Sequence, residues 1–399
     1  MSRIDPSSSR GPRPAAVAAA RELYRPPAPG EGLASVLPAA LVALGVDLPH
    51  GIPTPSWSLP AARHVVVVLV DGLGARQLER RGGHAPFLRT MDAATPEARC
   101  AFPSTTATSL TSLGTGLPAG GHGIVGWQTV LPDGRLFNHL GWRDGPDPLV
   151  HQPHPTLLQH AEAAGVSVTT VSRPLFESSG FTRAALRGGG YVATEDAGER
   201  AAGVLGALAG AGRTGRSLVY AYWDEVDKAG HVHGPGSMEW GEALEGVDSF
   251  VREVAGGAPK DTVVLLTSDH GMVDAPHLHR RDLAHDDALA AGVRMLAGEP
   301  RAPQAWCAPG RVEEVVDTWT HELGDSALVL TRAEAVEAGW FGPVHPGYEE
   351  RIGEVVAVLL DATTVLDSRL LRPQVLALRG HHGSVTDAET AIPLLVHRA

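Results

Sequence analysis

Residues 64–72 read HVVVVLVDG, an almost wholly apolar run that ends in an aspartate and a glycine. A short apolar run without polar alternation is typical of a strand buried on both faces, as in a parallel sheet covered by helices. Segments with helical patterns, such as 155–164 and 238–254, separate this run from later ones. The later runs lie at 166–171, 217–222, 262–267, 355–360 and 392–396. The alternation of strands and helices predicts an α/β sandwich with a mostly parallel central sheet.

The stretch 274–344 differs from the segments on either side of it. It carries two short strand patterns of its own, at 292–296 and 327–330, and a helical pattern near 311–323. We therefore expect a small inserted α+β subdomain at 274–344. The catalytic core is then expected to consist of residues 61–273 and 345–399.

Residues 1–60 are predicted to form an N-terminal lead-in that is partly disordered and contains a short helix. The first thirty of them are rich in proline, alanine and charged residues, and Leu23 is the first leucine. Because no apolar region of a signal peptide precedes Leu23, we expect a cytoplasmic protein.

The composition disfavours several classes of protein. The 399 residues carry a formal net charge of −12, whereas non-specific nucleic-acid binding needs a basic face. The longest aliphatic run, 65–70, is far shorter than the ~20 residues that span a bilayer. Two cysteines are too few for a disulfide framework. Histidine occurs 19 times, and because histidine is a common metal ligand, these residues direct attention to a metal site.

Acidic residues and histidines cluster at the turns beside the predicted strands. Ligands of open parallel sheets bind beyond the carboxyl ends of the strands. A single aspartate there often only caps the next helix, but here such groups recur at four places. They are Asp71; Asp224, Asp227, His231 and His233; Asp269 and His270; and His381 and His382. Mixed carboxylate and imidazole ligands favour Zn²⁺, Mn²⁺ or Fe, and the number of ligands favours two ions sharing one cleft.

The segment 101–127, AFPSTTATSLTSLGTGLPAGGHGIVGW, offers a nucleophile. Its threonines stand at the start of a short predicted helix, where backbone N–H groups and the helix dipole attract an anion. Taken in isolation, Ser104, Thr105 and Thr106 are interpreted as no more than capping residues of this helix. A hydroxyl group needs a base or a metal for activation, and the metal site predicted nearby would supply one.

Taken together, residues 63–396 resemble the type I phosphodiesterase/nucleotide pyrophosphatase family of the alkaline phosphatase superfamily. The resemblance rests on motifs in the order of the family. They are Val70-Asp71-Gly72, the segment 102–124, Asp227 to His231 with Gly234-Pro235, Ser268 to Met272, and Gly380 to Gly383. The resemblance implies an alkaline phosphatase-like three-layer sandwich.

The resemblance also implies roles for single residues. In the family, the nucleophilic threonine lies nine residues before the threonine of a Thr-Gly pair, which here is Thr115. The resemblance therefore implies Thr106 as the nucleophile, with Thr105 as its nearest rival. One divalent ion, Zn²⁺ in the first place and Mn²⁺ or Fe as alternatives, would be held by Asp227, His231 and His382. A second ion would be held by Asp71, Asp269 and His270. Three other residues, Asp224, His233 and His381, fall outside the matched ligand positions.

The chain departs from the family at Trp127. Nucleotide-cleaving members have an asparagine there that holds a phosphoryl oxygen, so the metal site is better supported than nucleotide specificity. We interpret Trp127 as a substrate-binding residue.

The predicted function is hydrolysis of phosphodiester or pyrophosphate bonds through a phospho-threonine intermediate, with a small phosphorylated molecule as substrate. A phosphomonoesterase or a carbon–phosphorus hydrolase of the same superfamily is the first alternative. A sulfatase and a phosphoglycerate mutase-like isomerase are disfavoured because their sequence patterns are not evident. From another class, a metal-binding scaffold without turnover stays open. The sequence does not determine the oligomeric state.

Overall fold

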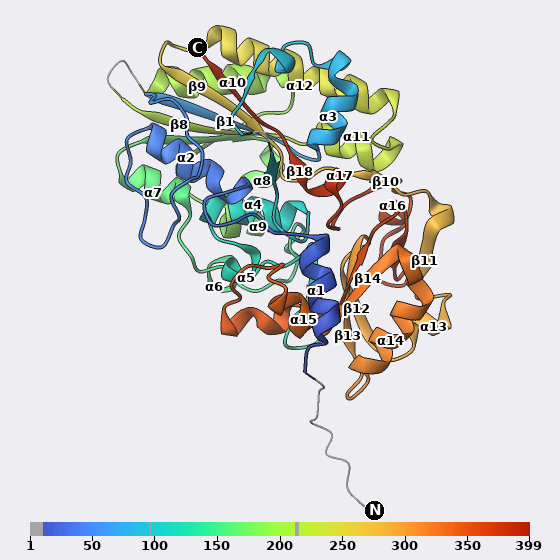
Figure 1. Ribbon diagram of the computed structural model, residues 1–399. Coiled ribbons are helices and arrows are strands. Elements are labelled where there is room, and N and C mark those ends of the chain that lie inside the picture. The colour runs from blue at the N-terminus through green and yellow to red at the C-terminus, as the bar shows by residue number, and fades with distance from the viewer. Residues whose placement is uncertain (1–10, 96, 212–214) are drawn as a thin grey trace, which may run out of the picture.

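The computed structural model describes residues 11–95, 97–211 and 215–399, and its largest element is a seven-stranded sheet (Figure 1). The strand order is β2-β19-β9-β1-β8-β6-β7. Five consecutive strands, β9, β1, β8, β6 and β7, run parallel, and β19 and β2 add an antiparallel edge on the side of β9. The strand bounds are β1 His64–Val70, β2 Asp92–Ala93, β6 Ser167–Ser172, β7 Gly190–Ala193, β8 Ser217–Trp223, β9 Thr262–Thr267 and β19 Leu394–Arg398.

Helices cover both faces of this sheet, because successive side chains of its central strand enter two different cores. Val65, Val67 and Leu69 of β1 pack into one core, whereas Val66 and Val68 pack into the other. The first core is covered by α2 Val36–Ala43, α4 Thr106–Thr115, α7 Leu157–Ala163 and α9 Gly180–Ala185. The second is covered by α3 Ala75–Arg81, α10 Ala197–Gly210, α11 Glu225–His233 and α12 Met238–Gly257 (Figure 1). The prediction of an α/β sandwich with a mostly parallel central sheet is confirmed.

A second, six-stranded sheet lies beside the main one, in the order β14-β15-β13-β12-β4-β5, and all its pairs are antiparallel. Helix α14 (Val312–Leu323) covers one face. The other face packs against α15 (Arg332–Glu337) and α1 (Pro14–Leu23), which the figure shows side by side (Figure 1). The strands are β4 Gln128–Val130, β5 Leu136–Asn138, β12 Val293–Glu299, β13 Ala302–Cys307, β14 Ala327–Thr331 and β15 Val355–Leu359.

Two expectations about strands change in the structure. The run at 355–360 forms β15, which lies in the second sheet and not in the main one. A continuous apolar run shows only that both faces are buried, and both sheets bury their central strands. The run at 392–396 is split by Pro393 into β18 (Ala391–Ile392) and β19, because proline has no N–H to donate to a sheet.

The predicted insertion at 274–344 coincides with only part of the second sheet. That sheet also takes β4 and β5 from before residue 274 and β15 from after residue 344. The division of the chain at these two positions therefore stays a prediction, and strand pairing crosses both of them. The helix expected in the N-terminal lead-in is α1, whereas the disorder expected at its start falls on residues 1–10, outside the described residues.

Three short strand pairs tie distant segments of the chain together. β10 (Val273–Asp274) pairs with β17 (Gly380–His381), which brings the segment after β9 beside the late histidines. β3 (Ala98–Arg99) pairs with β18, shortly before the threonine segment. β11 (Arg280–Asp282) pairs with β16 (Thr364–Leu366). The remaining helices are short: α5 Ala119–His122, α6 Pro148–His151, α8 Pro174–Glu177, α13 Asp287–Ala290, α16 Pro373–Leu376 and α17 Asp387–Thr390.

Candidate active site

The carboxyl ends of β1, β8 and β9 are adjacent, and each delivers an acidic residue or a histidine to one cleft. Asp71 directly follows β1, and Asp269 and His270 follow β9. Asp227 and His231 lie on α11, which begins just after β8. Gly72 allows α11 to approach, since a Cβ on it would lie 2.9 Å from the Cα of Asp227 and its φ is +71°. Neighbouring parallel strands therefore assemble the site from segments far apart in the sequence.

The first cluster contains Asp71, Asp269 and His270. One ligand atom from each lies within 4.8 Å of the other two, and all three side chains are buried. His270 Nε2 is 3.4 Å from Asp71 Oδ1 and 3.6 Å from Asp269 Oδ2. The backbone N–H of Gly72 donates to Asp269 Oδ1 at 3.1 Å. These are the three residues that the resemblance implies for one ion.

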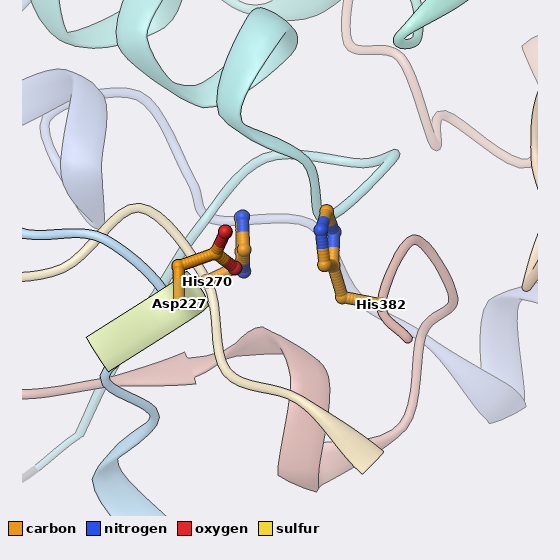
Figure 2. A group of neighbouring side chains, drawn as sticks. All are labelled: Asp227, His270 and His382. Atoms are coloured by element: carbon orange, nitrogen blue, oxygen red, sulfur yellow. The ribbon is translucent and has the colours of Figure 1, made fainter. Parts of the chain in front are cut away.

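The second cluster contains Asp227, His270 and His382, whose ligand atoms also lie within 4.8 Å of one another. Figure 2 shows the carboxylate of Asp227 directed toward His270, with the His382 ring nearly parallel to the His270 ring. The two imidazoles stack with centroids 3.7 Å apart and an interplanar angle of 16°. His231, which the sequence places here, is not in this group, but its Nε2 lies 3.4 Å from Asp227 Oδ2 and its ring 5.2 Å from that of His382. His270 thus lies between the two predicted ligand sets.

All three histidines present the same ring nitrogen to the cleft. Each donates Nδ1–H to a backbone carbonyl: His231 to Gly380 at 2.7 Å, His270 to Gly271 at 3.0 Å and His382 to Ser104 at 2.8 Å. Such a bond leaves the lone pair of Nε2 free and fixes the ring orientation, as it does in metal-binding histidines. The three residues are therefore preorganised to bind a cation.

The carboxylates of the cleft lie close together, and their basic neighbours among the described residues are histidines, with no lysine or arginine paired to them. Burial raises the pKa of Asp71 well above its usual range, and the nearby Asp269 and Asp227 raise it further. Burial also raises the pKa of Asp227. Asp227 Oδ1 and Asp269 Oδ2 are buried and have no hydrogen-bond partner among the described residues. This donor set fits divalent cations, because such ions would neutralise the charges and bind the unpartnered oxygens.

The structure distinguishes the two candidate nucleophiles. Thr106 is the first residue of α4, and its hydroxyl lies 3.4 Å from Asp71 Oδ1 and 3.2 Å from His270 Nε2. Thr105 is the N-cap residue, and its hydroxyl is hydrogen-bonded to Glu299 instead. Only the hydroxyl of Thr106 therefore contacts residues of the metal-ligand clusters, and it does so where the N–H groups of α4 can receive an anion.

A cavity of 330 Å³ opens beside Thr106 and the clusters. Its wall is formed mainly by aromatic and aliphatic side chains, among them Leu110, Leu140, Phe176, Phe181 and Tyr191. An apolar pocket with a few polar groups at one end is the usual form of a small-molecule site. The cavity therefore has room for an organic group attached to a phosphoryl centre at Thr106.

The sequence profile of the type I phosphodiesterase/nucleotide pyrophosphatase family matches residues 65–385. The chain belongs to this family. Membership of this family supports an enzyme of the phosphodiesterase/pyrophosphatase type of hydrolase. A search of curated proteins finds no match.

Several solved structures are similar in fold to this chain. Murine ectonucleotide pyrophosphatase/phosphodiesterase 5 superposes with a TM-score of 0.67 at 21% identity, over 84% of this chain and 87% of that one. An inactive form of the same protein has been solved in complex with AMP (TM-score 0.66, 20% identity, 84% of this chain and 87% of that one). Phosphonoacetate hydrolase from Sinorhizobium meliloti 1021, in complex with phosphonoacetate, gives 0.61 at 21% identity, over 85% and 91%. The fold is thus the alkaline phosphatase-like fold that these structures share.

The remaining residues that the sequence singled out have different surroundings. Trp127 lines the cavity, and its backbone N–H donates to Glu299 Oε1 at 2.7 Å. Asp224 also lines the cavity and pairs with Lys228 and, at 3.3 Å, with Arg173. His381 and His233 take no part in the two metal-ligand clusters of the described chain: His381 lines the cavity, and His233 lies 3.8 Å from Glu239.

Two acidic or hydroxyl-bearing residues that contact the predicted site residues, Tyr222 and Glu299, were missed by reasoning from the sequence. Tyr222 donates its hydroxyl to Asp71 Oδ2. A signal existed for it, since Tyr222 ends the strand predicted at 217–222; in the structure it pairs with Leu69, two residues before Asp71. Glu299 had no such signal, because it comes from the second sheet and follows an ordinary strand pattern.

Proposed function

We propose that this chain is a two-metal hydrolase that cleaves phosphodiester or pyrophosphate bonds and uses Thr106 as its nucleophile. The observation that carries the proposal is the convergence at Thr106. Its hydroxyl lies within 3.4 Å of Asp71 and His270 of the ligand clusters, and His231, His270 and His382 each direct Nε2 to the cleft. A hydroxyl group so placed beside a cation-binding cleft is suited to attack on phosphorus.

The residues that would hold the ions are the six predicted from the sequence. Asp71, Asp269 and His270 would hold one ion, and Asp227, His231 and His382 the other, with Zn²⁺ as the first candidate. When bound, a pair of divalent ions would lower the pKa of the nucleophile's hydroxyl and neutralise charge on the oxygens of the phosphoryl group.

The chain's own residues then carry the reaction in two steps. In the first, Thr106 Oγ gives its proton to solvent and bonds to phosphorus while the bond from phosphorus to the leaving oxygen breaks, and the leaving group departs as an oxyanion that solvent can protonate. In the second, water attacks phosphorus, the bond to Oγ breaks, and the threonine hydroxyl is restored. The backbone N–H groups at the start of α4 face the phosphoryl oxygens during both steps, and the hydroxyl of Tyr222 holds Asp71 in place.

Hydrolysis of bis-p-nitrophenyl phosphate tests the proposal. We expect release of p-nitrophenol by protein loaded with Zn²⁺ or Mn²⁺, and slower release from mono-p-nitrophenyl phosphate. Faster cleavage of the monoester, or cleavage of phosphonoacetate alone, would reassign the enzyme within the superfamily. No turnover of any of the three by metal-loaded protein would leave the binding scaffold as the function.

Cytoplasmic location stays a proposal from the sequence, and fractionation of the native host would test it. Of the helices in the described residues, none is long and apolar enough to cross a membrane.

A further inference from the structure

Glu299 is a buried carboxyl group that reaches the cavity from the second sheet. It is the last residue of β12, next to the two-residue turn that leads into β13, and only 4% of its surface is exposed. It lines the cavity together with Thr106 and His382. It makes no salt bridge with any described residue. A carboxyl group in such a position, with no cationic partner, needs an explanation.

The turn that carries Glu299 is firmly fixed. Arg301, fully buried, pairs with Glu389 at 2.9 Å and donates to the carbonyl of Leu359 at 2.9 Å. Glu389 in turn accepts the backbone N–H of Ser384 at 3.0 Å, two residues after His382. The position of Glu299 is therefore tied to the loop that carries a predicted metal ligand.

The stem of the Glu299 side chain packs closely against Gly383. Gly383 has a φ of +129°, and a Cβ there would lie 2.5 Å from the Cβ of Glu299. Glu299 Oε1 accepts the backbone N–H of Trp127 at 2.7 Å, and the hydroxyl of Thr105 also bonds to the carboxyl group. Thr105 precedes the proposed nucleophile, so the carboxyl group lies next to the place where phosphorus would be attacked.

The negative charge of the substrate determines which protonation state of Glu299 is compatible with binding. A phosphodiester is an anion, and an ionised carboxylate beside it would repel its oxygens. Burial raises the pKa of Glu299 to about 8, although the bonds from Thr105 and Trp127 lower it. A neutral carboxyl group can accept the N–H of Trp127 through one oxygen and donate through the other.

We propose that Glu299 is a substrate-binding residue whose neutral carboxyl group donates a hydrogen bond to a non-bridging oxygen of the phosphoryl group held at Thr106. The proposal rests on the proposed function for the identity of the bound group. It adds a contact from the second sheet to a site otherwise built by the main sheet. Glutamine at this position would preserve the donor, whereas alanine would remove it.

The experiment compares Glu299→Gln and Glu299→Ala with wild type, using bis-p-nitrophenyl phosphate as the substrate. For Glu299→Ala we expect kcat/KM to fall about 100-fold at pH 7, the effect of removing one donor to a phosphoryl or oxyanion oxygen. For Glu299→Gln we expect a loss of no more than about 3-fold, because the amide donates in the same place. Both variants are expected to keep the wild-type metal content by elemental analysis and the wild-type Tm.

Glu354→Gln is the matched control. Glu354 also belongs to the second sheet region and also accepts a backbone N–H, that of Cys307 at 2.7 Å, but it does not line the cavity. We expect Glu354→Gln to leave kcat/KM unchanged. Equal losses in Glu299→Gln and Glu299→Ala, or full activity in Glu299→Ala, would overturn the role of Glu299 as a donor.

Binding of inorganic phosphate separates this proposal from the proposed function. Calorimetric titration of metal-loaded wild type, Glu299→Gln and Glu299→Ala needs no turnover. We expect the alanine variant alone to bind phosphate at least 10-fold more weakly. If wild type binds phosphate in this way but cleaves no ester, the proposed function fails and the role of Glu299 stands. If the three proteins bind phosphate equally, the role of Glu299 fails whatever their activity.

Discussion

Two groups of histidines in this protein have opposite surroundings, and all their members are buried except His231, which is half-buried. His231, His270 and His382 face the carboxylates Asp71, Asp227 and Asp269 at the ends of the main strands. The second group, His122, His139 and His151, lies in the segment 122–151, and two of its members pack among Phe137 and Trp142.

The bonding of the second group differs as well. His139 and His151 hydrogen-bond to each other through their Nε2 atoms at 3.2 Å, and His122 Nε2 bonds to Ser112 Oγ at 2.9 Å. The metal-ligand clusters of the described residues include none of these three. A group of imidazoles is therefore not sufficient to form a candidate cation site in this protein. The two groups differ in the presence of carboxylates and in the orientation of Nε2.

The largest expected effect is that of Thr106→Ala, which removes the proposed nucleophile. We expect turnover of bis-p-nitrophenyl phosphate to fall by about 10³-fold or more, with unchanged metal content. Thr106→Ser, which keeps a hydroxyl group, should retain measurable activity. Full activity of Thr106→Ala combined with its loss in Thr105→Ala would transfer the role to Thr105.

Asp269→Asn tests whether carboxylates distinguish the two histidine groups. Asp269 is fully buried, and one of its oxygens is unpartnered in the described chain, so removal of its charge should weaken one ion site. We expect elemental analysis to show a decrease from about two bound ions towards one. His151→Asn, which alters the aromatic group, should leave the metal content at its wild-type value. A metal content that falls in His151→Asn and not in Asp269→Asn would reverse the assignment.

Acid stability should report on the second group. Burial lowers the pKa of His122 and of His139 to about 3, and that of His151 to about 2. In the unfolded chain these rings take up protons below about pH 6.5, and the folded state does not. Their contribution to stability is therefore complete above pH 6.5 and decreases by up to ~1.4 kcal/mol per pH unit for each ring as the pH falls towards the folded-state pKa.

His151→Gln makes this prediction measurable. The variant is expected to lose less stability than wild type between pH 6.5 and pH 4.5 in urea titrations, since it has one fewer buried ring to protonate. The measurement uses metal-free protein, so that loss of metal in acid does not contribute. If the free energies of unfolding of the two proteins decrease equally over this pH range, the lowered pKa of His151 is contradicted.

The site residues that follow strands of the main sheet could be predicted from the sequence, whereas the residue from the second sheet could not. The carboxyl ends of parallel strands lie at one edge of a sheet, so residues that directly follow apolar runs can be placed together from residue order alone. Asp71, Asp269 and His270 were found in this way. Glu299 could not be found, because no local pattern shows which turn of an antiparallel sheet will reach another sheet.

The run at 355–360 shows the same limit for the fold. Its apolar residues show that it is a buried strand, but its partners β13 and β14 are fixed by pairing with distant segments. Helix α4 begins in the threonine segment, where the sequence predicts a helix, and it ends at Thr115, before Gly116, which adopts the left-handed conformation that favours glycine.

The sequence by itself determined the α/β class and pointed to the acidic residues and histidines beside the strands and to the threonine segment, because these depend on residue type and on position beside a strand. The choice of six of these residues as metal ligands came from the family resemblance. The tertiary structure alone decided that Thr106 and not Thr105 faces the ligands. It also decided that His270 lies between both ligand sets and that a buried glutamate from a second sheet borders the cavity. Those features depend on side-chain direction and on contacts between distant segments, which the order of residues does not specify locally.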